Sequence, residues 1–193
     1  MKFNNIIKKV ELSQDSNQNI FKIEGYEFFL EGMDTVGGNS SIFRASDPDG
    51  EPGYVVKFCR FPLGASYGKA KHRVQRFERE IEALKTARSS SYSNCVVSIV
   101  EDGSLVLKKS RGSGYERIGF YVMEQADSNL TTYLEQNDLS FPQQVYLCNE
   151  LLVILRGLHT LGIYHRDIKA DNILMRDSRP LFGDLGLIAY RSL

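Results

Sequence analysis

The chain has 193 residues, of which 42% are hydrophobic and 25% charged, the balance of an ordinary soluble globular protein with one domain or two small lobes. Its 24 Lys and Arg residues equal its 24 Asp and Glu residues, which argues against a general binder of nucleic acid. No apolar run approaches the roughly 20 residues of a membrane helix, and the first residues lack the apolar core of a secretory signal. The widely spaced Cys59, Cys95 and Cys148 predict buried thiols in a reducing cytoplasm rather than disulfides or a zinc site.

The first part of the chain carries strand patterns. Residues 1–24 are polar and rich in amides, which predicts an extension with at most a short strand. Beyond them, short segments rich in aromatic and β-branched residues are separated by turn residues, the pattern of a β-sheet. The predicted strands are residues 26–30, 41–45, 54–59, 95–100 and 118–123.

Two long helices are also predicted. Residues 72–86 form one, because Val74, Phe77, Ile81 and Leu84 recur at helical spacing and make one apolar stripe. The second occupies residues 141–161.

The second helix has clear start and stop signals. Ser140 and Gln143 form a capping box, Pro142 lies in the first turn and Gly162 ends the helix. Its buried stripe is predicted to be Val145, Cys148, Leu151, Leu152, Leu155 and Leu158. The chain is therefore predicted to be α+β, changing from strands to helices near residues 124–129.

The most specific string is H-R-D-I-K-A-D-N at residues 165–172, directly after the second helix. It resembles the catalytic loop H-R-D-L-x-x-x-N of the protein kinases at every polar position. The resemblance extends over residues 26–187. The alternative, a polar loop whose Asp caps a turn, is disfavoured because eight consecutive positions match.

The resemblance implies a protein kinase-like two-lobe fold. Residues 1–24 are then an N-terminal extension. Residues 25–124 are the N-lobe, an antiparallel β-sheet with one long helix. Residues 125–193 are an incomplete helical C-lobe.

The resemblance also implies site residues for phosphoryl transfer, which requires an in-line nucleophile and neutralisation of the phosphates. Asp167 is implied to accept or orient the hydroxyl proton, and Lys169 to reach the transferred phosphate. Asn172 is an implied magnesium ligand. Asp184 is the other, because G-D-L-G at residues 183–186 resembles the D-F-G motif, with Leu185 in place of Phe.

In the first lobe, V-V-K at residues 55–57 resembles the V-A-I-K of the third kinase strand, so Lys57 is implied to contact the α- and β-phosphates. A lone strand Lys is otherwise usually a solvated edge charge. The implied ion-pair partner is Glu80, with Glu78 and Glu82 as alternatives.

The glycine-rich loop is the weakest match, since only Gly37 falls on a pattern glycine. The fifteen-residue gap from Ile42 to Lys57 fits two strands that return to the same site. Met123 is implied to lie at the back of the pocket. The implied ATP-binding residues are Gly37, Gly38, Asn39, Ser40, Ile42, Val55, Lys57, Met123, Glu124, Ala126 and Leu174. His72 and His159 are predicted to be structural or surface residues.

The chain ends nine residues after Asp184, where a complete kinase continues through its activation segment. Three explanations stay open: a fragment of a longer protein, a truncated product with little activity, or a module completed by a second chain. The helix at residues 141–161 is expected to lose much of its packing, so that an apolar patch lies open.

The expected function is that of a cytoplasmic serine/threonine protein kinase domain. ATP, Mg²⁺ and a protein substrate are the expected ligands, and neither nucleic acid nor a membrane is an expected partner. A kinase-shaped regulatory or interaction module with little catalysis is one alternative. A small-molecule phosphotransferase is another, against which Lys169 argues.

Overall fold

The computed structural model describes residues 14–15, 18–23, 26–36, 40–46, 52–64, 67–108 and 115–190. The chain divides into two compact units. Unit 1 comprises Met1–Phe77 and Val100–Gln125, and unit 2 comprises Glu78–Ile99 and Ala126–Leu193. Within the described ranges, no helix is long and apolar enough to span a bilayer.

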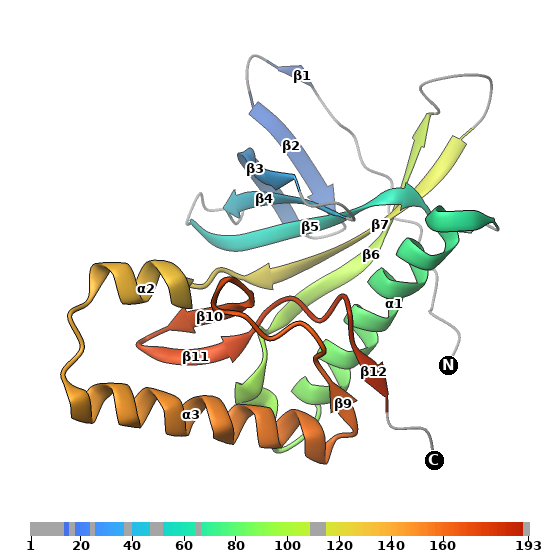
Figure 1. Ribbon diagram of the computed structural model, residues 1–193. Helices are drawn as coiled ribbons and strands as arrows, with labels where there is room; N and C mark the ends of the chain where they lie inside the picture. Colours follow the sequence, from blue (N-terminus) through green and yellow to red (C-terminus); the bar gives the residue numbers. More distant parts are fainter. Residues whose placement is uncertain are drawn as a thin grey trace. The chain divides into compact units, whose positions relative to one another are not determined.

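Unit 1 is built on a seven-stranded sheet with strand order β1-β2-β3-β4-β5-β7-β6 (Figure 1). The pairings from β1 through β7 are antiparallel. The strands are β1 (Gln14–Asp15), β2 (Gln18–Ile23), β3 (Tyr26–Val36), β4 (Ser40–Ser46), β5 (Pro52–Pro62), β6 (Ile99–Lys108) and β7 (Tyr115–Glu124). The predicted extension at residues 1–24 thus contributes two strands, and β2 pairs along β3.

The register of β4, β5 and β7 divides their side chains between two faces, because directly opposed residues share a face. Val56 is paired with Phe43 and with Val122, which places all three on one face. This face carries a hydrophobic cluster: Phe43, Ala45, Tyr54, Val56, Phe58, Phe120 and Val122. Lys57 points to the opposite face, together with its paired neighbours Ile42 and Tyr121.

Helix α1 (Gly68–Arg88) contributes to both units. In unit 1 the Phe77 ring lies 5.6 Å from the Tyr121 ring. The predicted apolar stripe is confirmed, since its four members are at most 5% exposed. The helix extends beyond the predicted residues 72–86 at both ends.

Unit 2 combines helices with two small sheets, of strand orders β11-β10-β8 and β12-β9. Helix α3 packs against β11, β9 and η1 (Figure 1). The elements are η1 (Ser93–Cys95), β8 (Ser128–Asn129), α2 (Leu130–Gln136), α3 (Phe141–Thr160), β9 (Ile163–Tyr164), η2 (Ala170–Asn172), β10 (Ile173–Arg176), β11 (Arg179–Phe182) and β12 (Ala189–Tyr190).

The predicted ends of α3 are confirmed. The Ser140 N–H donates to Oε1 of Gln143 at 2.9 Å, which satisfies a donor at the helix start. After the helix, Gly162 has φ 71°, the left-handed conformation that glycine adopts without strain.

The predicted buried stripe of α3 is wrong for several members. Val145 and Leu152 are 53% and 65% exposed, and Cys148 is exposed, so it is not a buried thiol. The residues that pack are Leu147, Ile154, Gly157 and Leu158. Apolar residues surround more of this helix than its neighbours cover, and hydrophobic periodicity alone could not select the covered face. The open apolar patch expected on this helix is therefore present.

The strand predicted at residues 95–100 begins too early. Ser93–Cys95 is a 3₁₀ turn, closed by the Cys95 N–H donating to the Tyr92 carbonyl at 3.0 Å, and β6 begins at Ile99. Between them, Val96 forms an isolated parallel bridge with Phe182. Overall, the predicted α+β class is confirmed: an antiparallel sheet with one long helix in the first part of the chain, and further helices later.

Candidate functional site

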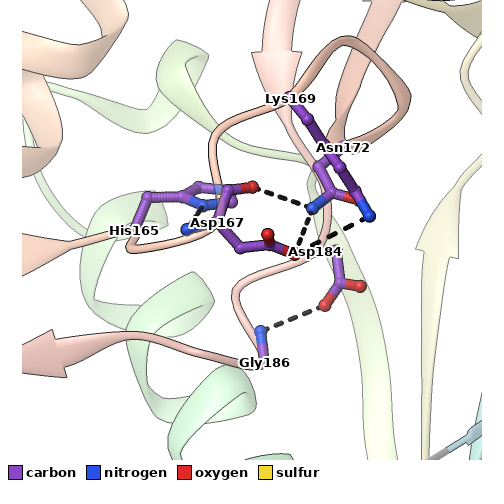
Figure 2. Close-up of polar contacts among 6 residues, drawn as sticks. All are labelled: His165, Asp167, Lys169, Asn172, Asp184 and Gly186. Atoms are coloured by element: carbon purple, nitrogen blue, oxygen red, sulfur yellow. Dashed lines mark hydrogen bonds and ion pairs between the residues drawn. The ribbon is translucent and has the colours of Figure 1, made fainter. Parts of the chain in front are cut away.

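The predicted catalytic loop brings Asp167 and Asn172 into direct contact. Nδ2 of Asn172 donates to the Asp167 carbonyl oxygen at 2.9 Å and to its Oδ2 at 2.8 Å (Figure 2). The short helix η2 makes this contact possible, because the Asn172 N–H donates back to the Lys169 carbonyl at 3.0 Å. The amide of Asn172 therefore contacts the carboxylate of Asp167, five positions earlier in the chain.

Lys169 lies beside the same carboxylate. Its Nζ is 3.9 Å from Oδ2 of Asp167, and the two side chains are 54% and 42% exposed. An ion pair this open to solvent contributes at most ~1 kcal/mol to stability. The ammonium is thus held near Asp167 without being needed to hold the fold.

His165 supports the loop from inside and had no assigned role in the sequence prediction. It is 1% exposed, its Nδ1 accepts from the Asp167 N–H at 3.3 Å, and its ring lies 4.7 Å from the Phe182 ring. Burial lowers the pKa of His165, outweighing the opposite effect of the Asp184 and Asp167 carboxylates. Its burial continues the alternation of the strand before it, in which Ile163 is buried and Tyr164 is exposed.

The backbone between His165 and Asp167 is strained. Arg166 has φ 67°, a left-handed conformation that costs a non-glycine residue on the order of 1 kcal/mol. This turn keeps His165 buried while the Asp167 side chain stays half-exposed. Strain of this kind is typical of functional loops.

The G-D-L-G segment follows β11 directly. The end of that strand is fixed by the Val97 N–H, which donates to the Phe182 carbonyl at 3.0 Å. Oδ1 of Asp184 accepts from the Gly186 N–H at 3.0 Å (Figure 2). Leu185, which stands in place of the motif's Phe, is fully buried.

Both glycines of this segment lie close to neighbouring side chains. A Cβ at Gly183 would lie 2.9 Å from Cγ of Leu174, and one at Gly186 would lie 3.0 Å from Oδ1 of Asp184. The Gly186 position is also 3.9 Å from Oε2 of Glu80. Glu80 is therefore a neighbour of the G-D-L-G segment within unit 2.

Of the three candidate glutamates on α1, Glu80 is the buried one, at 2% exposed. Glu82 is exposed, and burial raises the pKa of the half-buried Glu78. The pairing of Glu80 with Lys57 stays a prediction.

Outer hydrogen bonds fix the loop to its neighbours. Oγ1 of Thr131, on α2, donates to Oδ1 of Asp171 at 2.7 Å, and Asn129 caps α2 by accepting from the Thr132 N–H at 2.8 Å. No local pattern predicts the Thr131–Asp171 contact, because 40 residues separate the partners.

In unit 1, five of the predicted ATP-binding residues of the sheet share one face. Lys57 pairs with Ile42 and Val55 pairs with Met123, so all four lie opposite the hydrophobic cluster. Ser40, paired with Cys59, belongs to the same face. Lys57 is 5% exposed, with Nζ 5.8 Å from the centre of the Tyr121 ring.

The remaining predicted residues are placed as follows. Glu124 pairs with Tyr54, which puts its side chain on the hydrophobic-cluster face. Ala126 is half-buried in unit 2, and Leu174 lies on β10 opposite Leu181. Three predicted residues lie outside the described part of the chain: Gly37, Gly38 and Asn39.

Comparison with known proteins returns protein kinases. The chain is 32% identical over 112 residues to a probable serine/threonine-protein kinase of Encephalitozoon cuniculi, covering 58% of this chain and 19% of that protein. It is 27% identical over 167 residues to the probable serine/threonine-protein kinase YbdM of Bacillus subtilis, covering 86% and 59%. It is 26% identical over 170 residues to CBL-interacting protein kinase 22 of rice, covering 80% and 34%. No protein-family model matches the chain.

These similarities confirm the predicted resemblance to the protein kinase family. The chain spans less than two thirds of the length of each of these three relatives.

Proposed function

We propose that this chain carries the phosphotransfer site of an ATP-dependent serine/threonine protein kinase, which moves the γ-phosphate of ATP to a protein hydroxyl. The observation that carries the proposal is the contact between Asp167 and Asn172, with Lys169 beside it. The names of the similar proteins support the same class.

In this proposal Asp167 takes the proton of the substrate hydroxyl. Its Oδ2 accepts from Asn172 and faces Lys169, which leaves Oδ1 to accept the hydroxyl hydrogen. As the hydroxyl oxygen bonds to the γ-phosphorus, the bond to the β-phosphate oxygen breaks, ADP leaves and the proton passes to Asp167. The Lys169 ammonium offsets negative charge on the phosphoryl oxygens.

The donor set of the loop fits a magnesium ion. Asn172 commits its Nδ2 to Asp167, so its carbonyl oxygen is the part of the amide that can bind a cation. Asp184 adds a carboxylate, and Mg²⁺ takes oxygen ligands of both kinds. When bound, the ion neutralises charge on the phosphates.

Lys57 and its face of the unit 1 sheet belong to the same proposal. Ser40, Ile42, Val55 and Met123 are proposed to contact the nucleotide, as are Gly37, Gly38, Asn39, Glu124, Ala126 and Leu174. Their support is the shared face of the strand residues and the match to kinase motifs. A cytoplasmic location, suggested by the widely spaced cysteines, is part of the proposal as well.

The deciding experiment is transfer of labelled phosphate from ATP and Mg²⁺ to a generic basic protein by purified wild-type and Asp167→Asn chains. Transfer is expected to fall at least ~100-fold in the variant, while ATP raises the Tm of both proteins equally. Asp138→Asn, on an exposed loop position, is the matched control and should behave as wild type. Transfer that persists in the Asp167 variant contradicts the role assigned to this carboxylate.

A regulatory module with little catalysis is the second candidate. It draws on the imperfect glycine-rich loop. A wild-type chain that is stabilised by ATP and transfers no phosphate favours this candidate, and restoration of transfer by a second chain supports completion in trans.

A further inference from the structure

The charges of this chain are unevenly distributed, although they cancel overall. Between Glu51 and Glu78 there is no acidic residue. Six cations lie in that segment, so the rest of the chain carries a formal charge of −6. They are Lys57, Arg60, Lys69, Lys71, Arg73 and Arg76.

Four basic residues in this segment form a stripe on α1, which we call the basic stripe: Lys69, His72, Arg73 and Arg76. Their spacing is i, i+3, i+4 and i+7, which places them on one face of a helix. Lys69, His72 and Arg76 are exposed. Within the described part of the chain, none of these three side chains forms a hydrogen bond or an ion pair.

Arg73 is held in place by an aromatic ring. Its guanidinium lies 4.9 Å from the centre of the Phe61 ring, and the side chain is half-buried. Stacking of this kind fixes the orientation of the Arg73 side chain beside the three exposed members of the basic stripe.

The basic stripe is unfavourable for the helix that carries it. The first turn of α1 has no acidic residue, and cations there oppose the helix dipole. Like charges at i, i+4 repel each other as well. These charges lower the stability of the helix, so folding does not explain their presence. Binding of a partner explains them more readily.

We infer that the basic stripe is a docking surface for a short acidic segment of a protein partner. The stripe is ~10 Å long at the rise of an α-helix, the length of about three extended residues. A duplex nucleic acid presents phosphates over a longer path and would meet the net negative remainder of the chain. A short run of Asp and Glu matches both the length and the sign of the stripe. This inference does not depend on phosphoryl transfer.

The test is fluorescence anisotropy of the full chain with a labelled hexaglutamate peptide at low salt. Hexaserine and a short DNA duplex serve as alternative probes. The test variant is Lys69→Gln with Arg76→Gln, and the control is Lys71→Gln with Lys85→Gln, which removes two cations from other faces of the same helix. The Tm of each protein is measured in parallel.

Saturable binding of hexaglutamate that falls at least ~10-fold in the test variant and less than ~2-fold in the control supports the docking surface. The Tm of the test variant is expected to equal or exceed that of wild type, so that lost binding cannot come from unfolding. Equal losses in both variants, no saturable binding of hexaglutamate, or tighter binding of the DNA duplex each overturn it.

Discussion

Asn172 donates twice to Asp167, once to the backbone carbonyl and once to the carboxylate. The same side chain therefore stabilises the predicted catalytic loop and is a proposed metal ligand. The fold and the chemistry of this loop depend on one amide group.

Replacing Asn172 by Ala removes both hydrogen bonds. We expect the free energy of unfolding to fall by about 1–3 kcal/mol and phosphate transfer, where wild type shows it, to fall ~100-fold. Urea denaturation and the labelled-ATP assay measure the two effects. Asn137→Ala is the control, since its exposed amide donates only to the Tyr133 carbonyl at 2.8 Å, and a loss as large as that of Asn172→Ala contradicts the argument.

Gly157 lies where α3 meets the η1 region. A Cβ at this position would be 2.6 Å from Sγ of Cys95 and 2.9 Å from Cδ1 of Tyr92. Gly157→Ala is therefore expected to destabilise the chain by about 1–3 kcal/mol through overpacking. Cys95→Ala makes room, so the double variant should lose less than the sum of the single losses. Additive losses in a denaturation cycle would show that the two sites do not touch.

His165 predicts how stability depends on pH. Because burial lowers its pKa in the folded chain, the unfolded chain binds more protons below pH 6.5. The stabilisation present above that pH is expected to decline as the pH falls through 6.5 toward the lowered folded value. His165→Asn keeps an acceptor for the Asp167 N–H and does not titrate. The Tm of wild type should thus fall more steeply than that of the variant between pH 7.5 and 5.5, and parallel curves speak against this assignment.

Tyr190 should lose its phenolic proton at a higher pH than an ordinary tyrosine. Burial, reinforced by Glu82 and partly offset by Arg79, raises its pKa from 10.0 to about 12. The folded chain therefore holds this proton longer than the unfolded chain, and its stability should fall as the pH rises through that interval. Glu82→Gln is expected to lower the pKa and Arg79→Gln to raise it, as read by carbon NMR of the tyrosine rings. The opposite order would contradict the assignment of Glu82 and Arg79 as the charges that act on Tyr190.

The sequence predicted those elements whose signal is local. The α1 stripe needed only helical spacing, and the start of α3 needed only Ser140 and Gln143. The buried face of α3 could not be chosen, because Leu147 and Leu152 are equally apolar and only the packed neighbours distinguish them.

In the candidate site as well, features with a local sequence signal were predicted and features that depend on the fold were not. The contact of Asp167 with Asn172 follows from a contiguous motif, whereas the Thr131–Asp171 hydrogen bond joins residues that only the fold brings together. The role of His165 was likewise hidden, because burial and not residue type sets its protonation.

The division of the unit 1 sheet into two faces makes strand β5 intolerant of changes in length. An insertion of one residue before Val55 would exchange the orientations of Val56 and Lys57. An ammonium would then lie among Phe43, Phe120 and Val122 on the neighbouring strands, while an isopropyl group took its place on the proposed nucleotide side. Deletions and insertions should therefore be purged from this strand far more strongly than substitutions.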